Sequence, residues 1–198
     1  MKNILLIGNS KNVVNKEFIK KTTVQFDHVC RFNHNWAHIY DIVKFYTGDW
    51  FNTLITSNFA HDTSIRELQN FGLLDKVDKI YLICPNSNHR MKINKINIAY
   101  EEITDAEYDN IQHILENYGF PLNKKTARTG ITTIIYFSLI KKYNVYIYGI
   151  DVYGTDNPLD QHINNNHKID MNMHSIEDES KLLMKLLKDN HITLYDDI

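Results

Sequence analysis

The chain opens with KNILLIGNS, residues 2–10. The apolar run Asn3–Ile7 predicts a β-strand, and Gly8 after it lets the backbone turn sharply. Similar short apolar runs, bounded by Asn, Asp, Gly or Pro, alternate with amphipathic segments along the chain. This alternation is typical of a parallel sheet covered by helices. The predicted strands are Asn3–Ile7, Asp27–Phe32, Asn52–Thr56, Lys79–Cys84, Val145–Gly149 and Ile192–Tyr195.

Helical spacing of apolar residues appears in five further segments. The last of them carries four leucines on one stripe, with lysines on the opposite face. We therefore predict an α/β fold in which residues 1–198 form one domain, with a single doubly wound, mostly parallel, Rossmann-like sheet and helices on both faces. Such a sheet binds ligands at the carboxyl ends of its strands. The predicted helices are Asn15–Lys21, Asp62–Phe71, Asp105–Tyr118, Gly130–Lys142 and Ser175–Lys188.

Composition narrows the class of protein. Of 198 residues, 22 are Lys or Arg and 24 are Asp or Glu, so the formal net charge is −2. This balance argues against a nucleic-acid partner, because binding phosphates requires clustered basic residues. The longest apolar stretch, Ile131–Ile140, is far shorter than the roughly 20 residues of a membrane span. Cys30 and Cys84 lie in apolar runs, which predicts buried thiols and a reducing, cytoplasmic compartment.

Three predicted neighbouring strands each end on an asparagine. Gly8-Asn9-Ser10 follows the first strand, Asn33 the second and Asn58 the third. Neutral amides at a switch point suit a ligand read through hydrogen bonds, such as a nucleotide or a sugar. The stretch lacks the three-glycine spacing of a dinucleotide fingerprint, which disfavours an oxidoreductase. Ordinary strand-end turns, in a chain rich in Asn, explain the same residues.

Thr129-Gly130 stands directly before an apolar helical segment, with Thr126 and Arg128 just upstream. The start of a helix presents unpaired N–H groups and the positive end of its dipole, so this segment is a candidate phosphate seat. A cap role for Thr129, without any ligand, explains the pattern equally well.

A polar loop, residues 154–174, carries His162, His167 and His174. Their spacing matches no standard zinc pattern, so we expect no metal. No Asp-x-Asp pair follows a strand in a position to bridge a diphosphate through a metal, so we expect chelation to leave activity unchanged. A single histidine acting as general base fits better. His174 is favoured because Ser175 begins an S-x-x-D pattern that can cap the next helix and fix the backbone. A solvated surface histidine is the alternative for each of them.

Taken together, these motifs resemble the sialyltransferases of glycosyltransferase families 29 and 42, most closely the small bacterial enzymes of family 42. The matches run in order along almost the whole chain. They cover residues 8–10 and 26–33 (first sialylmotif), 46–48 before the strand ending at Asn58, 129–130 and 146–153 (second sialylmotif), and 173–175.

The resemblance implies a metal-free, GT-A-like variant without a cofactor. Its donor substrate would be CMP-linked sialic acid or a related keto-sugar, and its acceptor a glycan or glycolipid. Transfer would invert the anomeric centre, with His174 deprotonating the acceptor hydroxyl and Tyr153 hydrogen-bonding the leaving phosphate. Peripheral membrane association and a homo-oligomer are both compatible with the chain. The donor and its nucleotide would be held by Gly8, Asn9, Ser10, Asn33, Asn58, Arg128, Thr129 and Gly130.

A non-catalytic nucleotide- or sugar-binding module is the alternative function. The bacterial enzymes use a second tyrosine in the loop after the first, and this chain has no tyrosine between Tyr153 and Tyr195. A module of this kind would keep the strand-end asparagines and lack transfer activity.

Overall fold

A computed structural model of the chain describes residues 1–9, 24–33, 36–37, 40–41, 51–57, 61–83, 97–124, 126–152 and 174–195. Its centre is a seven-stranded sheet in the order β5-β4-β3-β2-β1-β6-β7. Every neighbouring pair is parallel. The strands are β1 Asn3–Ile7, β2 His28–Phe32, β3 Thr53–Ser57, β4 Lys79–Ile83, β5 Ala99–Glu102, β6 Asn144–Tyr148 and β7 Ile192–Leu194.

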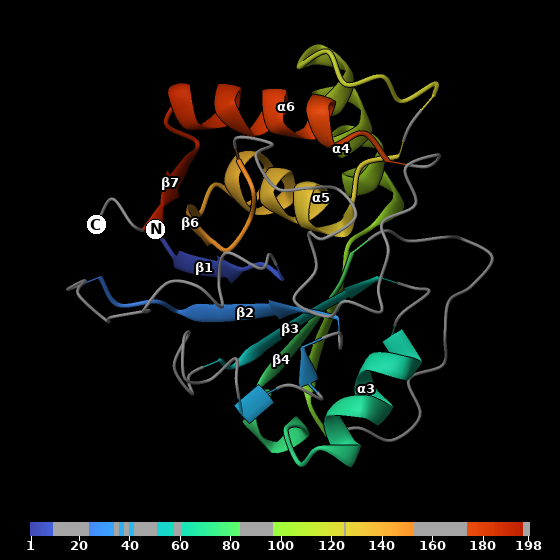
Figure 1. Ribbon diagram of the computed structural model, residues 1–198, viewed down its shortest axis with the longest axis vertical. Helices are drawn as coiled ribbons and strands as arrows, with labels where there is room; N and C mark the ends of the chain where they lie inside the picture. The colour runs from blue at the N-terminus through green and yellow to red at the C-terminus, as the bar shows by residue number, and fades with distance from the viewer. Residues whose placement is uncertain are drawn as a thin grey trace.

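Helices cover both faces of this sheet. Figure 1 shows α4, α5 and α6 on one face and α3 on the other. The predicted α/β, doubly wound fold is therefore confirmed. The helices are α3 His61–Asn70, a short 3₁₀ turn Leu74–Lys76, α4 Asp105–Asn117, α5 Thr129–Ile135, a π-helical turn Tyr136–Ile140 and α6 Ile176–Lys188.

The sequence did not predict one strand, one predicted helix is not α-helical throughout, and another predicted helix falls outside the described residues. The strand β5 was missed because its sequence, AYEE, is polar and half-exposed at the edge of the sheet. The predicted helix Gly130–Lys142 is helical as far as Ile140, but its second part, Tyr136–Ile140, is a π-helical turn that follows α5. The predicted helix Asn15–Lys21 lies outside the described part of the chain.

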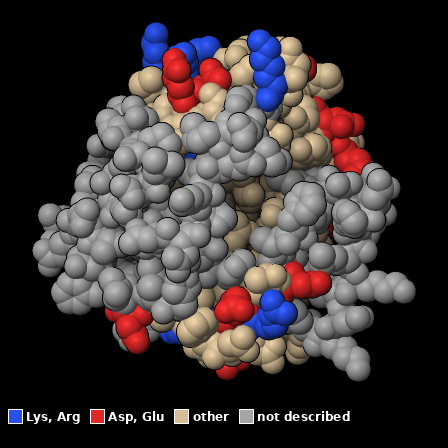
Figure 2. Space-filling model, turned by 45° about the vertical axis from the view of Figure 1, so that its right-hand side comes forward, with Lys and Arg blue, Asp and Glu red and all other residues tan. Residues whose placement is uncertain are grey.

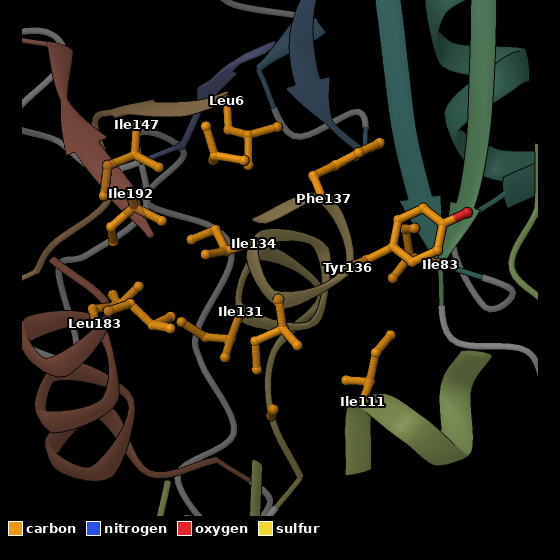
Figure 3. Close-up of a cluster of buried hydrophobic side chains, with 14 of the residues drawn as sticks. Leu6, Ile83, Ile111, Ile131, Ile134, Tyr136, Phe137, Ile147, Leu183 and Ile192 are labelled. Carbon is orange, nitrogen blue, oxygen red and sulfur yellow. The ribbon is translucent and has the colours of Figure 1, made fainter. Parts of the chain in front are cut away.

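The core has two halves because both faces of the strands are buried. In β1, Ile4 and Leu6 point toward α4–α6, whereas Leu5 and Ile7 point toward α3. Strands covered on both sides are expected to be apolar throughout, as β1 is. Figure 3 shows α5 packed into the first half, with side chains of the sheet on one side and Leu183 of α6 on the other.

The order of the strands locates the switch point. The chain adds β2 to β5 on one side of β1 and then places β6 and β7 on the other side. The ligand crevice of such a sheet lies where these two directions meet, outside the carboxyl ends of β1 and β6. Ile7 and Tyr148 pair at those ends, so Gly8 and Gly149 are the first residues beyond them.

Two predictions from composition can be compared with this structure. Cys30 is a buried free thiol, as predicted, while Cys84 lies outside the described residues. Among the residues that the structure describes, no helix has the length and apolar character needed to cross a membrane.

Candidate functional site at the carboxyl ends of the strands

Gly8 is packed against backbone at the switch point. Its N–H donates to the carbonyl oxygen of Tyr148 at 2.8 Å. A Cβ at this position would lie 2.2 Å from the carbonyl oxygen of Gly149 and 2.6 Å from Cγ1 of Ile150. Only a residue without a side chain fits there, and Gly149 itself has a positive φ of 62°. The first glycine of the predicted donor site therefore has a packing role.

Asn9 joins the end of β1 to the end of β2. Its Nδ2 donates to the carbonyl oxygen of Phe32 at 3.3 Å, and Trp36 Nε1 donates to the same oxygen at 3.2 Å. The Oδ1 of Asn9 is buried and has no hydrogen-bond partner among the described residues. A buried acceptor without a partner is costly, so this oxygen is the part of Asn9 that a ligand donor could satisfy.

Asn33 makes the corresponding link from β2 to β3. Its N–H donates to the carbonyl oxygen of Ile55 at 2.8 Å, and its Oδ1 accepts from the N–H of Ser57 at 3.4 Å. Its φ of 51° lies in the left-handed region, which Asn tolerates better than most residues. The structure thus brings Asn9 and Asn33 to the same edge, as predicted. The other two predicted residues there, Ser10 and Asn58, lie outside the described residues.

Arg31, between these two asparagines in sequence, is a buried cation on β2. Its guanidinium lies 5.4 Å from the ring centre of Trp36, and only 2% of the residue is exposed. Burial lowers the pKa of Arg31 to about 10, although the nearby Tyr40 and Tyr148 partly oppose this shift. Arg31 is therefore packed in the interior against Trp36.

The second half of the predicted site is the segment 126–130 at the start of α5, which lies on the carboxyl side of the sheet because α5 leads into the parallel strand β6. Arg128, in extended conformation, is the N-cap residue, and its side chain makes no capping hydrogen bond. Thr129 is already the first helical residue, and its carbonyl oxygen accepts from Thr133 Oγ1 at 2.7 Å. The alternative in which Thr129 caps the helix is therefore wrong. The binding of the sugar-nucleotide donor by Thr129 and Gly130 stays a prediction.

A residue that the sequence reasoning missed, Glu179 of α6, holds this segment. Its carboxylate accepts from the backbone N–H of Arg128 at 2.9 Å and also from Arg128 Nε. The side chain of Glu179 is 1% exposed, whereas that of Arg128 is 27% exposed. One edge of the Arg128 guanidinium thus donates a hydrogen bond to Glu179. Its predicted contact with the sugar-nucleotide donor stays a prediction.

His174 stands directly before α6 and reaches the same segment. Its Nδ1 lies 2.7 Å from the carbonyl oxygen of Thr126. A carbonyl oxygen can only accept, so Nδ1 carries the hydrogen of the neutral ring and the basic lone pair is on Nε2. The predicted cap is confirmed, because Ser175 Oγ accepts from the N–H of Asp178 at 3.3 Å. This cap fixes the backbone next to His174.

Charged side chains also gather between β4, β5, α4 and the π-helical turn. This lysine–glutamate cluster pairs Lys79 with Glu101 at 2.7 Å and Lys141 with Glu107 at 2.9 Å. Lys141 also lies 3.6 Å from Glu101, which accepts from Tyr136 Oη at 3.2 Å. Opposite charges face one another throughout, so the cluster is a structural network.

Two carboxyl groups of the cluster titrate abnormally. Burial raises the pKa of Glu101, but the hydrogen bond and charge of Lys79, with help from Tyr136 and Lys141, outweigh burial and hold the pKa below its usual value. The pKa of Glu107 is lowered in the same way, since hydrogen bonds from the Thr104 backbone and from Lys141 outweigh burial.

No metal centre is found among the described residues, where no group of three His, Cys, Asp or Glu side chains could hold an ion. His162, His167 and Tyr153 lie outside the described residues. The predicted role of Tyr153 and the predictions for the loop before His174 therefore stay predictions. Figure 2 shows that Lys and Arg of the described chain lie mainly toward the top and bottom of this view, where Asp and Glu lie close to them.

Comparison with protein-family models and with curated proteins gives no match for this chain.

Proposed function

We propose that the protein is an inverting, metal-independent glycosyltransferase that moves sialic acid or a related keto-sugar from CMP to a sugar acceptor. The observation that carries this proposal is the hydrogen bond from His174 Nδ1 to the carbonyl oxygen of Thr126. It supports a general base, because it leaves the lone pair of the neutral ring on Nε2. The topology supports a base here, since α6 starts on the carboxyl side of the sheet.

In the proposed reaction, His174 Nε2 removes the proton of the acceptor hydroxyl as its oxygen attacks the anomeric carbon. The bond from that carbon to the CMP phosphate oxygen breaks on the opposite face, and CMP leaves with the bonding electrons. The proton stays on His174 until solvent removes it. Stabilisation of the leaving phosphate would come from neutral donors and from Arg128, which are worth most where water is excluded.

The nucleotide half of the proposal rests on the strand ends. The buried Oδ1 of Asn9, which has no partner among the described residues, supports a ligand that donates a hydrogen bond at this point. Cytosine and ribose both offer such donors. The resemblance of residues 8–10 and 26–33 to the first sialylmotif supports CMP as the nucleotide.

The test is a transfer assay with CMP-sialic acid and a panel of galactosides, scored by the sialylated product and by CMP. His174→Ala should lower kcat by about 10²–10⁴, because general-base assistance has that magnitude. CMP affinity should be unchanged, since the base touches only the acceptor. His113→Ala is the matched control, because this α4 histidine is 77% exposed and pairs with Glu116 on its own helix.

Two outcomes would contradict the proposal. Retention of more than roughly a tenth of kcat by His174→Ala would show that the base is elsewhere. CMP binding with no transfer to any acceptor would favour the alternative, a non-catalytic nucleotide-binding module. The Asn9 acceptor supports that alternative as well, because it needs no contribution from His174.

A further inference from the structure

We propose that Glu179 is a positioning residue that holds His174 in the tautomer a general base needs. This inference rests on the proposed function of His174. It assigns a role to a carboxylate that does not itself contact the histidine. The connection runs from Glu179 through the Arg128 backbone to the Thr126 carbonyl, and from there to His174 Nδ1.

The burial of Glu179 is the first observation. The residue is 0% exposed and lies on the apolar stripe of α6, between Ile176 and Leu183. A carboxylate is expensive to bury unless it is charge-paired and hydrogen-bonded. Both of its oxygens accept from Arg128, one from the backbone N–H and one from Nε. A position that would otherwise be apolar on α6 is therefore occupied by a carboxylate that binds the backbone of Arg128.

The second observation is that α6 holds both ends of the His174 hydrogen bond. The donor end is fixed because Ser175 caps α6 through Asp178. The acceptor end is fixed because Arg128, two residues after Thr126, is bonded to Glu179 in the first turn of the same helix. The Thr126 carbonyl and the His174 ring are thus both held by α6, which keeps them within hydrogen-bond distance of each other.

The chemical consequence concerns the histidine tautomer. A neutral imidazole carries its hydrogen on whichever nitrogen has the better acceptor. If the segment 126–128 is released, the Thr126 carbonyl no longer holds the hydrogen on Nδ1. A larger share of the ring then carries it on Nε2, and in that form Nε2 cannot accept a proton from the acceptor sugar.

The variant Glu179→Gln tests this directly. A Gln side chain has one acceptor oxygen for two Arg128 donors, so one hydrogen bond is lost. We expect the ¹⁵N shifts of His174, measured on the full chain, to move from the Nδ1–H form toward a mixture. We expect kcat to fall about 10- to 100-fold, because tautomer and geometry both matter to a base. Glu177→Gln is the matched control, since this residue is 80% exposed and pairs with Lys181.

A second variant covers the case in which Glu179→Gln does not fold. Arg128→Lys keeps the backbone N–H bond to Glu179 and removes only the guanidinium Nε bond. It should shift the His174 tautomer in the same direction by a smaller amount. Its circular dichroism spectrum should match that of the wild type.

The spectroscopic readout separates this inference from the proposed function. A His174 tautomer that is unchanged in folded Glu179→Gln and in Arg128→Lys would overturn the positioning role, whatever the transfer activity. A tautomer that shifts as expected, in a protein that transfers no sugar, would leave the contact intact and remove the proposed function. A shift with the expected loss of kcat supports both.

Discussion

The two halves of the candidate site are built in different ways. At the strand ends, Gly8 packs against the backbone beyond β6, while Asn9 and Asn33 make hydrogen bonds to the ends of neighbouring strands. Most of their contacts therefore stabilise the sheet. At the start of α5, the backbone is held by Glu179 of α6 and by His174, which stands directly before α6, and the ring of His174 keeps a lone pair.

This difference separates stability from chemistry. Substitutions at the strand ends should act mainly on the free energy of unfolding, because those residues join one strand to the next. Substitutions at the start of α5 and α6 should act mainly on kcat of the proposed transfer reaction, because the groups there position the ring of His174. The following predictions probe this division, and the largest expected change in stability comes first.

Gly8→Ala should be the most destabilising substitution at the strand ends. Its Cβ would meet the backbone carbonyl of Gly149 at 2.2 Å, and backbone cannot move aside as a flexible side chain does. We expect the free energy of unfolding to fall by about 3 kcal/mol, the upper end for overpacking. Urea unfolding measures this change.

Gly130→Ala is the matched control on the other half of the site. Among the described residues, nothing lies within 4 Å of its added Cβ, and the residue is in α5. We expect the free energy of unfolding to rise by about 0.5–1 kcal/mol, because Ala favours a helix more than Gly does. Equal effects of the two substitutions would break the distinction between the halves.

Asn33→Ala should have an intermediate effect. It removes the acceptor for the Ser57 N–H and places a less tolerant residue at a φ of 51°. The lost hydrogen bond and the backbone strain each cost about 1 kcal/mol, so the free energy of unfolding should fall by about 2 kcal/mol. Asn33→Gly loses only the hydrogen bond, so its free energy of unfolding should fall by about half as much, about 1 kcal/mol. A larger loss for the glycine variant would contradict this account.

The pH dependence of stability should show the smallest effect. In the fold, the pKa values of Glu101 and Glu107 lie below their usual value, which is about 4.3 in an unfolded chain. Between these values the unfolded chain binds more protons, so the stabilisation present above about pH 4.3 is lost as the pH falls through the folded pKa values. Because the groups are partly exposed, we expect about 1 kcal/mol or less from each.

Lys141→Met should weaken this acid dependence, because Lys141 pairs with both glutamates. Lys181→Met is the control, since the Lys181–Glu177 pair is exposed. Urea titrations from pH 7 to pH 3 compare the two, and identical slopes would show that the lysine–glutamate cluster does not carry the effect.

The strands that are apolar could be predicted from sequence because both faces of the sheet are buried. The edge strand β5 could not, since its residues are half-exposed and its position depends on pairing with β4. The π-helical turn was also missed, because an apolar run such as Ile131–Ile140 does not reveal which carbonyl each N–H will bond.

For the site, sequence placed His174 correctly before a capped helix but missed Glu179. In sequence, Glu179 looks like one of three acidic residues that complement the helix dipole. Its signal was its position on the apolar stripe, three residues before Leu182, where a charge requires a buried partner. That partner, Arg128, is 51 residues away, so only the tertiary structure could identify it.

The central claim is that the strand ends and the start of α5 together hold a CMP-linked donor. The most direct measurement is the structure of a crystal soaked with CMP. We expect the cytosine to contact Gly8 and Asn9, with a hydrogen bond to Asn9 Oδ1, and the phosphate to contact Thr129 and Gly130 at the start of α5. CMP bound elsewhere, or no bound CMP at a saturating concentration, would contradict the donor site and the function proposed from it.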